Sequence, residues 1–190
     1  MKNVIIAGSS RCGKTTISKY FQKKYKLVHY KMDSIKRGID KNFWDGYKDD
    51  WKKVSPHMAY LINTIISERE DDYYVIDSCH LYPKDISKYN LENTIIVFVG
   101  HDTISVEEKL KQIRKYDHHA WTNFENDEYI RYSNQLGIDY SIEAKKQCEK
   151  LNIKYFDTSY NFLKVKKEII KYIEENLWKT LLKNLVYLNG

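Results

Sequence analysis

Residues 3–16 read NVIIAGSSRCGKTT, in which Gly8, Gly13, Lys14 and Thr15 complete the pattern G-x-x-x-x-G-K-T. A short apolar run precedes this pattern and a helical pattern follows it, which is the context that a phosphate-binding loop requires. The glycines allow several backbone N–H groups to point inward at phosphate oxygens. The N-terminus of the following helix adds partial positive charge. The stretch therefore predicts a site for a nucleoside triphosphate.

Each side chain of this loop has an expected role. Lys14 would reach the β- and γ-phosphates, and the Thr15 hydroxyl would bind Mg²⁺. The other loop residues would surround the phosphates with main-chain and short side-chain donors. They are Gly8, Ser9, Ser10, Arg11, Cys12, Gly13 and Thr16.

The composition narrows the class of ligand. The chain has 190 residues and a formal net charge of +6, a length that suits one domain with a buried core. Eight basic residues and no acidic one precede Asp33, so the segment with the phosphate loop suits a small polyanion. The 17 tyrosines are spread over the chain and form no signature of an RNA-binding sheet. We therefore expect no nucleic-acid partner.

The cysteines and the apolar runs indicate the compartment. Cys12, Cys79 and Cys148 are odd in number and widely spaced, which argues against a disulfide framework or a zinc site. The sequence shows no signal-peptide pattern and no apolar run of membrane-spanning length. We expect a cytoplasmic protein with no membrane partner, and the sequence is compatible with a monomer or a homodimer.

Short β-branched or aromatic runs alternate with helical patterns along the chain. This alternation predicts an α/β fold with three layers, in which helices cover both faces of a five-stranded parallel sheet. Ligands of such sheets bind at the carboxyl ends of the strands, so functional residues are expected just after strands. We predict strands at about 3–7, 27–31, 73–77, 94–99 and 153–157, and helices at about 14–25, 51–69, 105–116, 127–150 and 161–177.

Three segments fit this alternation poorly. One is the amphipathic tail over residues 178–190, for which the sequence leaves open packing on the sheet or against a partner. Residues 38–57 gather aromatic side chains among acidic ones and are predicted to form a small cap. Residues 115–128 are predicted to form a lid. His118 and His119 have no third metal ligand at a suitable spacing, so we expect them to be exposed lid residues and not metal ligands. We expect one domain over residues 1–190 that carries this cap and lid.

Two aspartates follow predicted strands. Asp33 comes after the second strand, and Asp77 ends the third strand. An acid in this position can hold the Mg²⁺ of a bound nucleotide, usually through water. Asp33 can instead accept the proton of an attacking hydroxyl or bind the acceptor. Either aspartate fits the metal role, which leaves the other, Asp33 or Asp77, to bind the acceptor. Each is also a good N-cap for a following helix.

Arginines and one polar turn complete the set of candidates. The planar guanidinium group stabilises phosphoryl oxygens bidentately, which makes Arg114 and Arg131, on either side of the predicted lid, candidate phosphate clamps. Arg37 lies one helical turn after Asp33, where it can face the acceptor. The turn Asp157-Thr158-Ser159 follows the fifth strand and can either bind a base edge or begin the next helix.

With these residues in place, the chain resembles the small P-loop kinases: the adenylate, cytidylate and shikimate kinases and the chloramphenicol phosphotransferase-like enzymes. The resemblance implies a parallel sheet with an acceptor-binding cap, a closing lid and Mg-ATP as the phosphoryl donor. It also implies that Arg114 stacks on adenine and that Arg131 reaches the acceptor or the phosphates. The matching positions are 8–16, Asp33-Ser34, Arg37, Asp77, the Arg114–Arg131 region and 157–159.

The residues after Asp77 read Ser-Cys-His-Leu-Tyr-Pro, which matches neither the adenylate nor the shikimate kinase pattern. The sequence therefore predicts an ATP-dependent kinase whose acceptor is a nucleoside monophosphate or a hydroxyl-bearing metabolite. Two alternatives are a regulatory nucleotide-binding protein without transfer activity and a kinase of polynucleotide ends.

Overall fold

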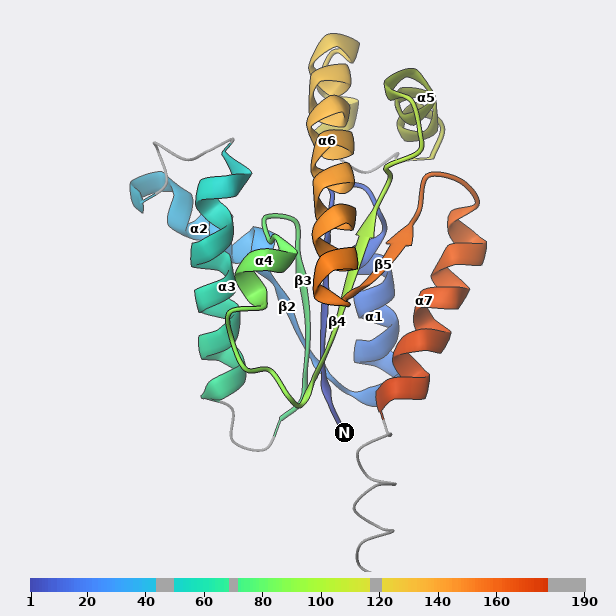
Figure 1. Cartoon of the computed structure of the whole chain (residues 1–190). Coiled ribbons are helices and arrows are strands. Elements are labelled where there is room, and N and C mark those ends of the chain that lie inside the picture. The colour runs from blue at the N-terminus through green and yellow to red at the C-terminus, as the bar shows by residue number, and fades with distance from the viewer. Residues whose placement is uncertain (44–49, 69–71, 117–120, 178–190) are drawn as a thin grey trace, which may run out of the picture.

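The structure is a computed structural model that describes residues 1–43, 50–68, 72–116 and 121–177. Its centre is a five-stranded parallel sheet in the order β2-β3-β1-β4-β5 (Figure 1). The strands are β1 (Asn3–Gly8), β2 (Val28–Lys31), β3 (Tyr74–Ser78), β4 (Thr94–Gly100) and β5 (Lys154–Asp157). All five strands predicted from the sequence are present, each within one residue of its predicted bounds.

The predicted helices are also confirmed. They are α1 (Lys14–Tyr25), α3 (Trp51–Ser67), α5 (Val106–Tyr116), α6 (Asp127–Leu151) and α7 (Phe162–Leu177). Three further elements were not delimited from the sequence: α2 (Met32–Phe43), the single turn α4 (Pro83–Ile86) and the 3-10 helix η1 (Trp121–Asn123). No residue separates β2 from α2, so Asp33 lies in the first helical turn directly after the strand.

Helices cover both faces of the sheet, as Figure 1 shows. On one face, Ile5, Ile76 and Phe98 pack with apolar residues of α3, α4 and α6. On the other face, Val4 and Ile6 pack with residues of α1 and α7. Because successive side chains of a strand point to opposite faces, the continuous apolar run of β1 fills both cores at once. The predicted three-layer α/β fold is confirmed.

The strand order positions the phosphate loop. β1 is the central strand, and its two neighbours, β3 and β4, follow it in the chain only after helical crossovers. A loop at the carboxyl end of this strand therefore opens into the crevice where parallel sheets bind ligands. In the described part of the chain, no helix is both long and apolar enough to cross a membrane.

The structure describes only part of the predicted cap and lid. Residues 38–43 form the end of α2, Asp50 caps α3, and 51–57 form the start of α3. Residues 44–49 and the tail 178–190 lie outside the described residues. In the predicted lid, residues 117–120, which include His118 and His119, lie outside the described residues. The cap and the lid therefore stay predictions.

Candidate nucleotide-binding site

Two glycines set the shape of the loop between β1 and α1. Gly8 has φ +145° and Gly13 has φ +81°, so both adopt backbone conformations that favour glycine. A Cβ on Gly8 would lie 1.8 Å from the carbonyl oxygen of Val99, and one on Gly13 would lie 2.2 Å from the ring of Phe162. The loop thus follows its path only because these positions lack side chains.

Lys14 begins α1 and turns back over the loop. Its Nζ donates to the carbonyl oxygen of Ser9 at 2.6 Å and to Cys79 Sγ at 3.4 Å. Burial by itself lowers the pKa of Lys14, but the Cys79 and Asp33 side chains outweigh this and raise the pKa overall. The ammonium is therefore charged and lies at the point where the motif predicts phosphate contact.

A cavity of about 1040 Å³ opens over the loop. That volume accommodates a nucleoside triphosphate, because pockets for drug-sized ligands fill about 300–1,000 Å³. Its walls come from the phosphate loop, the start of α2, the end of β3, α5, and the connection from β5 into α7. The lining residues outside the phosphate loop are Asp33, Cys79, Lys109, Gln112, Ile113, Tyr116, Thr158, Ser159, Asn161, Phe162 and Leu163.

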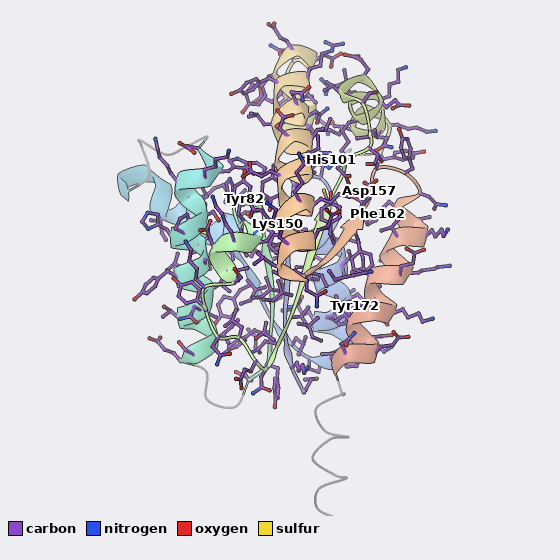
Figure 2. The ribbon with its side chains drawn as sticks, in the orientation of Figure 1. Tyr82, His101, Lys150, Asp157, Phe162 and Tyr172 are labelled. Carbon is purple, nitrogen blue, oxygen red and sulfur yellow. The ribbon has the colours of Figure 1, made fainter. Side chains whose placement is uncertain are left out.

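The residues of the turn after β5 have two different roles. Thr158 and Ser159 line it, in keeping with their predicted place in the site. Asp157 instead accepts hydrogen bonds from Thr103 Oγ1 at 2.6 Å and from the Ser159 backbone N–H at 2.9 Å. Asp157 ends β5 and Phe162 begins α7, and both are labelled in Figure 2. Asp157 thus holds the turn while its neighbours face the cavity.

Asp33 lies on the cavity wall and is held on two sides. Its Oδ1 accepts from the backbone N–H of Cys79 at 3.0 Å, and its Oδ2 accepts from Cys79 Sγ at 2.7 Å. Burial raises the pKa of Asp33, but the His80 ring, the Lys14 ammonium and the Cys79 hydrogen bonds together lower it well below its usual range. Asp33 is therefore a fixed carboxylate facing the cavity, beside the charged Lys14.

Asp77 lies elsewhere. Its Oδ2 is 2.8 Å from Nε2 of His29 on β2, and both side chains are almost fully buried. Asp77 does not line the cavity. Asp77 lies within β3, whereas Asp33 lies in the first turn of α2, so the two acids have different surroundings. The roles predicted for Asp77 at a metal or an acceptor stay predictions.

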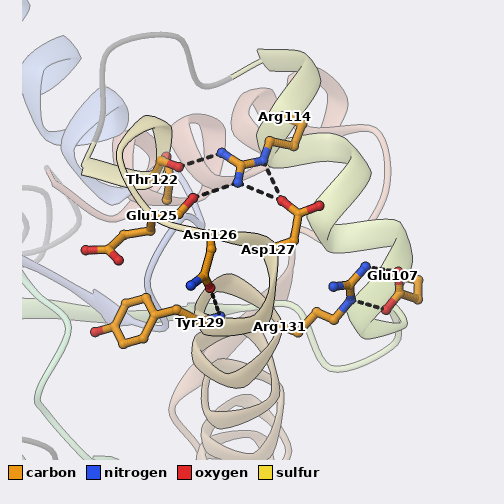
Figure 3. A network of polar contacts seen from close by, with 8 residues as sticks. All are labelled: Glu107, Arg114, Thr122, Glu125, Asn126, Asp127, Tyr129 and Arg131. Atoms are coloured by element: carbon orange, nitrogen blue, oxygen red, sulfur yellow. Dashed lines mark hydrogen bonds and ion pairs between the residues drawn. The ribbon is translucent and has the colours of Figure 1, made fainter.

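The lid-side arginines bind other protein groups (Figure 3). Arg114 donates to Asp127 Oδ1 at 2.7 and 3.0 Å and to the carbonyl oxygens of Thr122 and Glu125 at 2.6 and 2.8 Å. Arg131 donates to Glu107 at 2.7 Å. Neither arginine lines the cavity, so their phosphate contacts stay predictions. Arg37 is exposed and donates to Ser34 Oγ at 3.1 Å.

One buried histidine behind the phosphate loop was not predicted from the sequence. His101, which follows β4, lies 3.0 Å from Cys12 Sγ through Nδ1 and 3.5 Å from Ser9 Oγ through Nε2. Burial, with the charges of Lys109 and Lys14, lowers the pKa of His101 to about 3, so the ring is neutral. A Cβ on Gly137 of α6 would lie 2.7 Å from Ser9 Oγ. The helix therefore approaches the loop only because position 137 is glycine.

Sequence reasoning also missed several residues that line the cavity, and three of them contact the loop or Asp33. Lys109 is buried and donates to the carbonyl oxygen of Arg11 at 3.1 Å. Cys79 anchors Asp33, and Phe162 packs against Gly13. Of these three residues, Cys79 is the one that the sequence could have indicated as a site residue, because it follows a buried strand. Lys109 and Phe162 lie on helices whose periodicity predicts packing alone.

Comparison with known proteins supports the fold. No protein-family model matches the chain, and no curated protein matches its sequence. A shikimate kinase from Bacteroides thetaiotaomicron matches with a TM-score of 0.58 at 11% identity, over 91% of this chain and 98% of that chain. A gluconokinase from Sinorhizobium meliloti 1021 matches with a TM-score of 0.57 at 12% identity, over 100% and 98%.

A third structure, a shikimate kinase from Acinetobacter baumannii in complex with shikimate, matches with a TM-score of 0.58 at 14% identity, over 93% of this chain and 94% of that chain. The chain therefore has the fold of the small P-loop kinases, as its resemblance to them predicted. At these identities the likeness establishes the fold alone.

Proposed function

We propose that this protein is an ATP-dependent kinase that transfers the γ-phosphoryl group of Mg-ATP to a small acceptor. The observation that carries the proposal is the shared cavity of Lys14 and Asp33. A charged ammonium suited to phosphates and a fixed carboxylate suited to an acceptor meet at one opening. Phosphoryl transfer depends mainly on such positioning and on charge stabilisation.

The donor side follows from the loop. Backbone N–H groups between Gly8 and Thr15 would hold the phosphates, while Lys14 and Lys109 supply positive charge at the cavity wall. The Thr15 side chain lines the cavity and is partly exposed, so it fits the role of a Mg²⁺ ligand. Bound Mg²⁺ would neutralise charge that develops on the phosphates. The adenine would lie along Ile113, Thr158 and the neighbouring residues of the cavity.

The acceptor side favours a hydroxyl over an anionic phosphate. The lowered pKa keeps Asp33 negatively charged at neutral pH, so it repels a second anion and accepts a hydrogen bond from a hydroxyl. Hydrogen bonds from Cys79 fix the orientation of the carboxylate before an acceptor binds. Asp33 would thus orient the attacking oxygen through a hydrogen bond, since its lowered pKa makes it a weak proton acceptor. A nucleoside monophosphate is the alternative acceptor.

The proposal is tested by measuring ADP release across sugars, hydroxy acids, amino alcohols and nucleoside monophosphates. Lys14→Ala should abolish acceptor-dependent release, which excludes a contaminating ATPase. Asp33→Asn should lower kcat with intact ATP binding if the acceptor carries a hydroxyl, and should leave kcat nearly unchanged for a nucleoside monophosphate. Absence of magnesium-dependent ATP binding in calorimetry would rule the proposal out.

A further inference from the structure

Three side chains of different chemistry meet at the edge of the nucleotide cavity. Asp33 comes from the first turn of α2, and Cys79 and His80 follow β3. Cys79 Sγ lies 2.7 Å from Asp33 Oδ2, and His80 Nδ1 lies 3.6 Å from Asp33 Oδ1. One ligand atom of each residue lies within 4.8 Å of the other two. We call these residues the Asp33–Cys79–His80 cluster.

The donor set distinguishes among metals. A carboxylate oxygen, a thiol sulfur and an imidazole nitrogen are the three ligand types that Zn²⁺ uses, whereas Mg²⁺ prefers oxygen alone. Tetrahedral Zn²⁺ with bonds of about 2.0–2.3 Å places its ligand atoms about 3.5 Å apart. The distances between ligand atoms in the cluster lie on both sides of that value. Displacements of about 1 Å would therefore bring the three ligand atoms into tetrahedral positions around Zn²⁺.

The environment of His80 gives the most specific evidence for a metal-binding site. Its Nδ1 is buried and has no hydrogen-bond partner among the described residues, although a carboxylate oxygen lies 3.6 Å away. The ring packs against Trp51 with 5.1 Å between ring centroids, which restricts its orientation. A buried imidazole nitrogen is normally hydrogen-bonded. A metal ion would satisfy this atom.

We propose that Asp33, Cys79 and His80 bind Zn²⁺ through three protein ligands, leaving the fourth position open toward the nucleotide cavity. As the zinc–sulfur bond forms, the thiol proton of Cys79 passes to solvent, and no electron is transferred. The adjacent ammonium of Lys14, 3.4 Å from the sulfur, then donates a hydrogen bond to a thiolate. Groups that hydrogen-bond a metal ligand in this way support binding.

Zinc at this place would regulate the site. It would engage the Asp33 carboxylate and convert the Cys79 sulfur, which already accepts a hydrogen bond from Lys14, to a thiolate, so Zn²⁺ would inhibit transfer. This consequence rests on the proposed function, whereas metal binding itself does not. The sequence argued against a zinc site because the cysteines are widely spaced, but a single cysteine suffices here because the other ligands come from Asp33 and His80.

The test is a titration of the full chain with Co²⁺ as a spectroscopic substitute for Zn²⁺. We expect a thiolate-to-cobalt charge-transfer band with tetrahedral visible bands, both removed by one equivalent of Zn²⁺. Cys79→Ser should abolish the charge-transfer band, and His80→Ala should weaken Co²⁺ binding at least tenfold. The matched controls Cys148→Ser and His57→Asn should keep the wild-type spectrum. Circular dichroism verifies that each variant is folded.

Absence of the band in the folded wild-type chain, or its persistence in Cys79→Ser, would overturn the proposal. The readout separates metal binding from the proposed kinase activity. Magnesium-dependent ATP binding without a cobalt spectrum leaves the kinase assignment intact, and a cobalt spectrum without ATP binding leaves the metal site intact.

Discussion

The ring of Phe162 lies directly against Gly13, so that a Cβ at position 13 would come within 2.2 Å of the ring. The first turn of α7 thereby packs onto the phosphate loop. The two residues are far apart in the chain, and their contact joins the beginning of the fold to its end.

From this contact we predict that Gly13→Ala destabilises the protein and abolishes ATP binding. The left-handed backbone at position 13 alone costs about 1–2 kcal/mol with a side chain, and the overlap with Phe162 adds to it. Chemical denaturation and calorimetry with ATP measure the two effects. Gly38→Ala is the matched control, because nothing lies within 4 Å of its added Cβ and it lies within α2. It should be neutral or stabilise by up to about 1 kcal/mol.

The contact itself is tested with a double-mutant cycle. Phe162→Ala should cost less in the Gly13→Ala background than in the wild type, with a coupling of at least about 1 kcal/mol. Additive effects would show that the loop and α7 do not constrain each other.

The buried pair of His29 and Asp77 yields a second prediction. Replacing His29 by Leu leaves a buried carboxylate without its partner, which should lower the free energy of unfolding by about 3–5 kcal/mol. The double variant His29→Leu with Asp77→Leu should recover part of this loss. Urea denaturation measures both. Lys24→Ala, which removes an exposed ion pair with Glu174, should cost less than about 1 kcal/mol.

The same aspartate tests the predicted metal role. If Asp77 contacts Mg²⁺, Asp77→Asn will weaken magnesium-dependent ATP binding more than it weakens binding without magnesium. An equal effect under both conditions assigns the carboxylate to the fold.

Arg114 yields a third prediction. It binds Asp127 and two carbonyl oxygens of residues 122–125, so Arg114→Ala should loosen this segment and destabilise the protein by about 1–2 kcal/mol. Hydrogen exchange should accelerate over residues 121–127. Arg131→Ala is a suitable comparison, because its exposed pair with Glu107 should contribute less than about 1 kcal/mol. Equal exchange in the two variants would contradict the role given to Arg114.

His101 yields a prediction about pH. Its folded-state pKa of about 3 lies below the ordinary histidine value of 6.5, so the unfolded chain binds an extra proton between these values. The stability associated with a neutral His101 is thus complete above pH 6.5 and decreases as the pH falls toward 3. The loss between pH 6.5 and 5 should be about 1.5 kcal/mol. His101→Gln should flatten this part of the stability curve, and His57→Asn, at an exposed position, should leave it unchanged.

Much of the fold could be predicted because its signals are local. The phosphate loop is contiguous from Gly8 to Thr15, and the strands are short apolar runs between polar segments. The filter that expects functional residues at strand ends found Asp33, Thr158 and Ser159, all of which line the cavity. These residues share one property, since each lies within two residues of the end of a strand of the parallel sheet.

The rest of the site depends on contacts between distant segments. The strand-end filter cannot tell which face a side chain takes, so it grouped Asp77 with Asp33 although Asp77 pairs with His29. Lys109 reaches the loop from α5, and Arg114 finds its acceptors 8 to 13 residues along the chain. A helical pattern shows which residues are buried, but not which neighbour they meet.

The direct passage from β2 into α2 has a consequence for how the chain can vary. With no connecting residue between Lys31 and Met32, the sheet itself delivers Asp33 to its place. One residue inserted after Met32 would turn the carboxylate by about 100° around the helix axis and carry it away from Cys79. Length at this junction should therefore be as tightly restricted as length within the glycine loop, even though no sequence motif marks it.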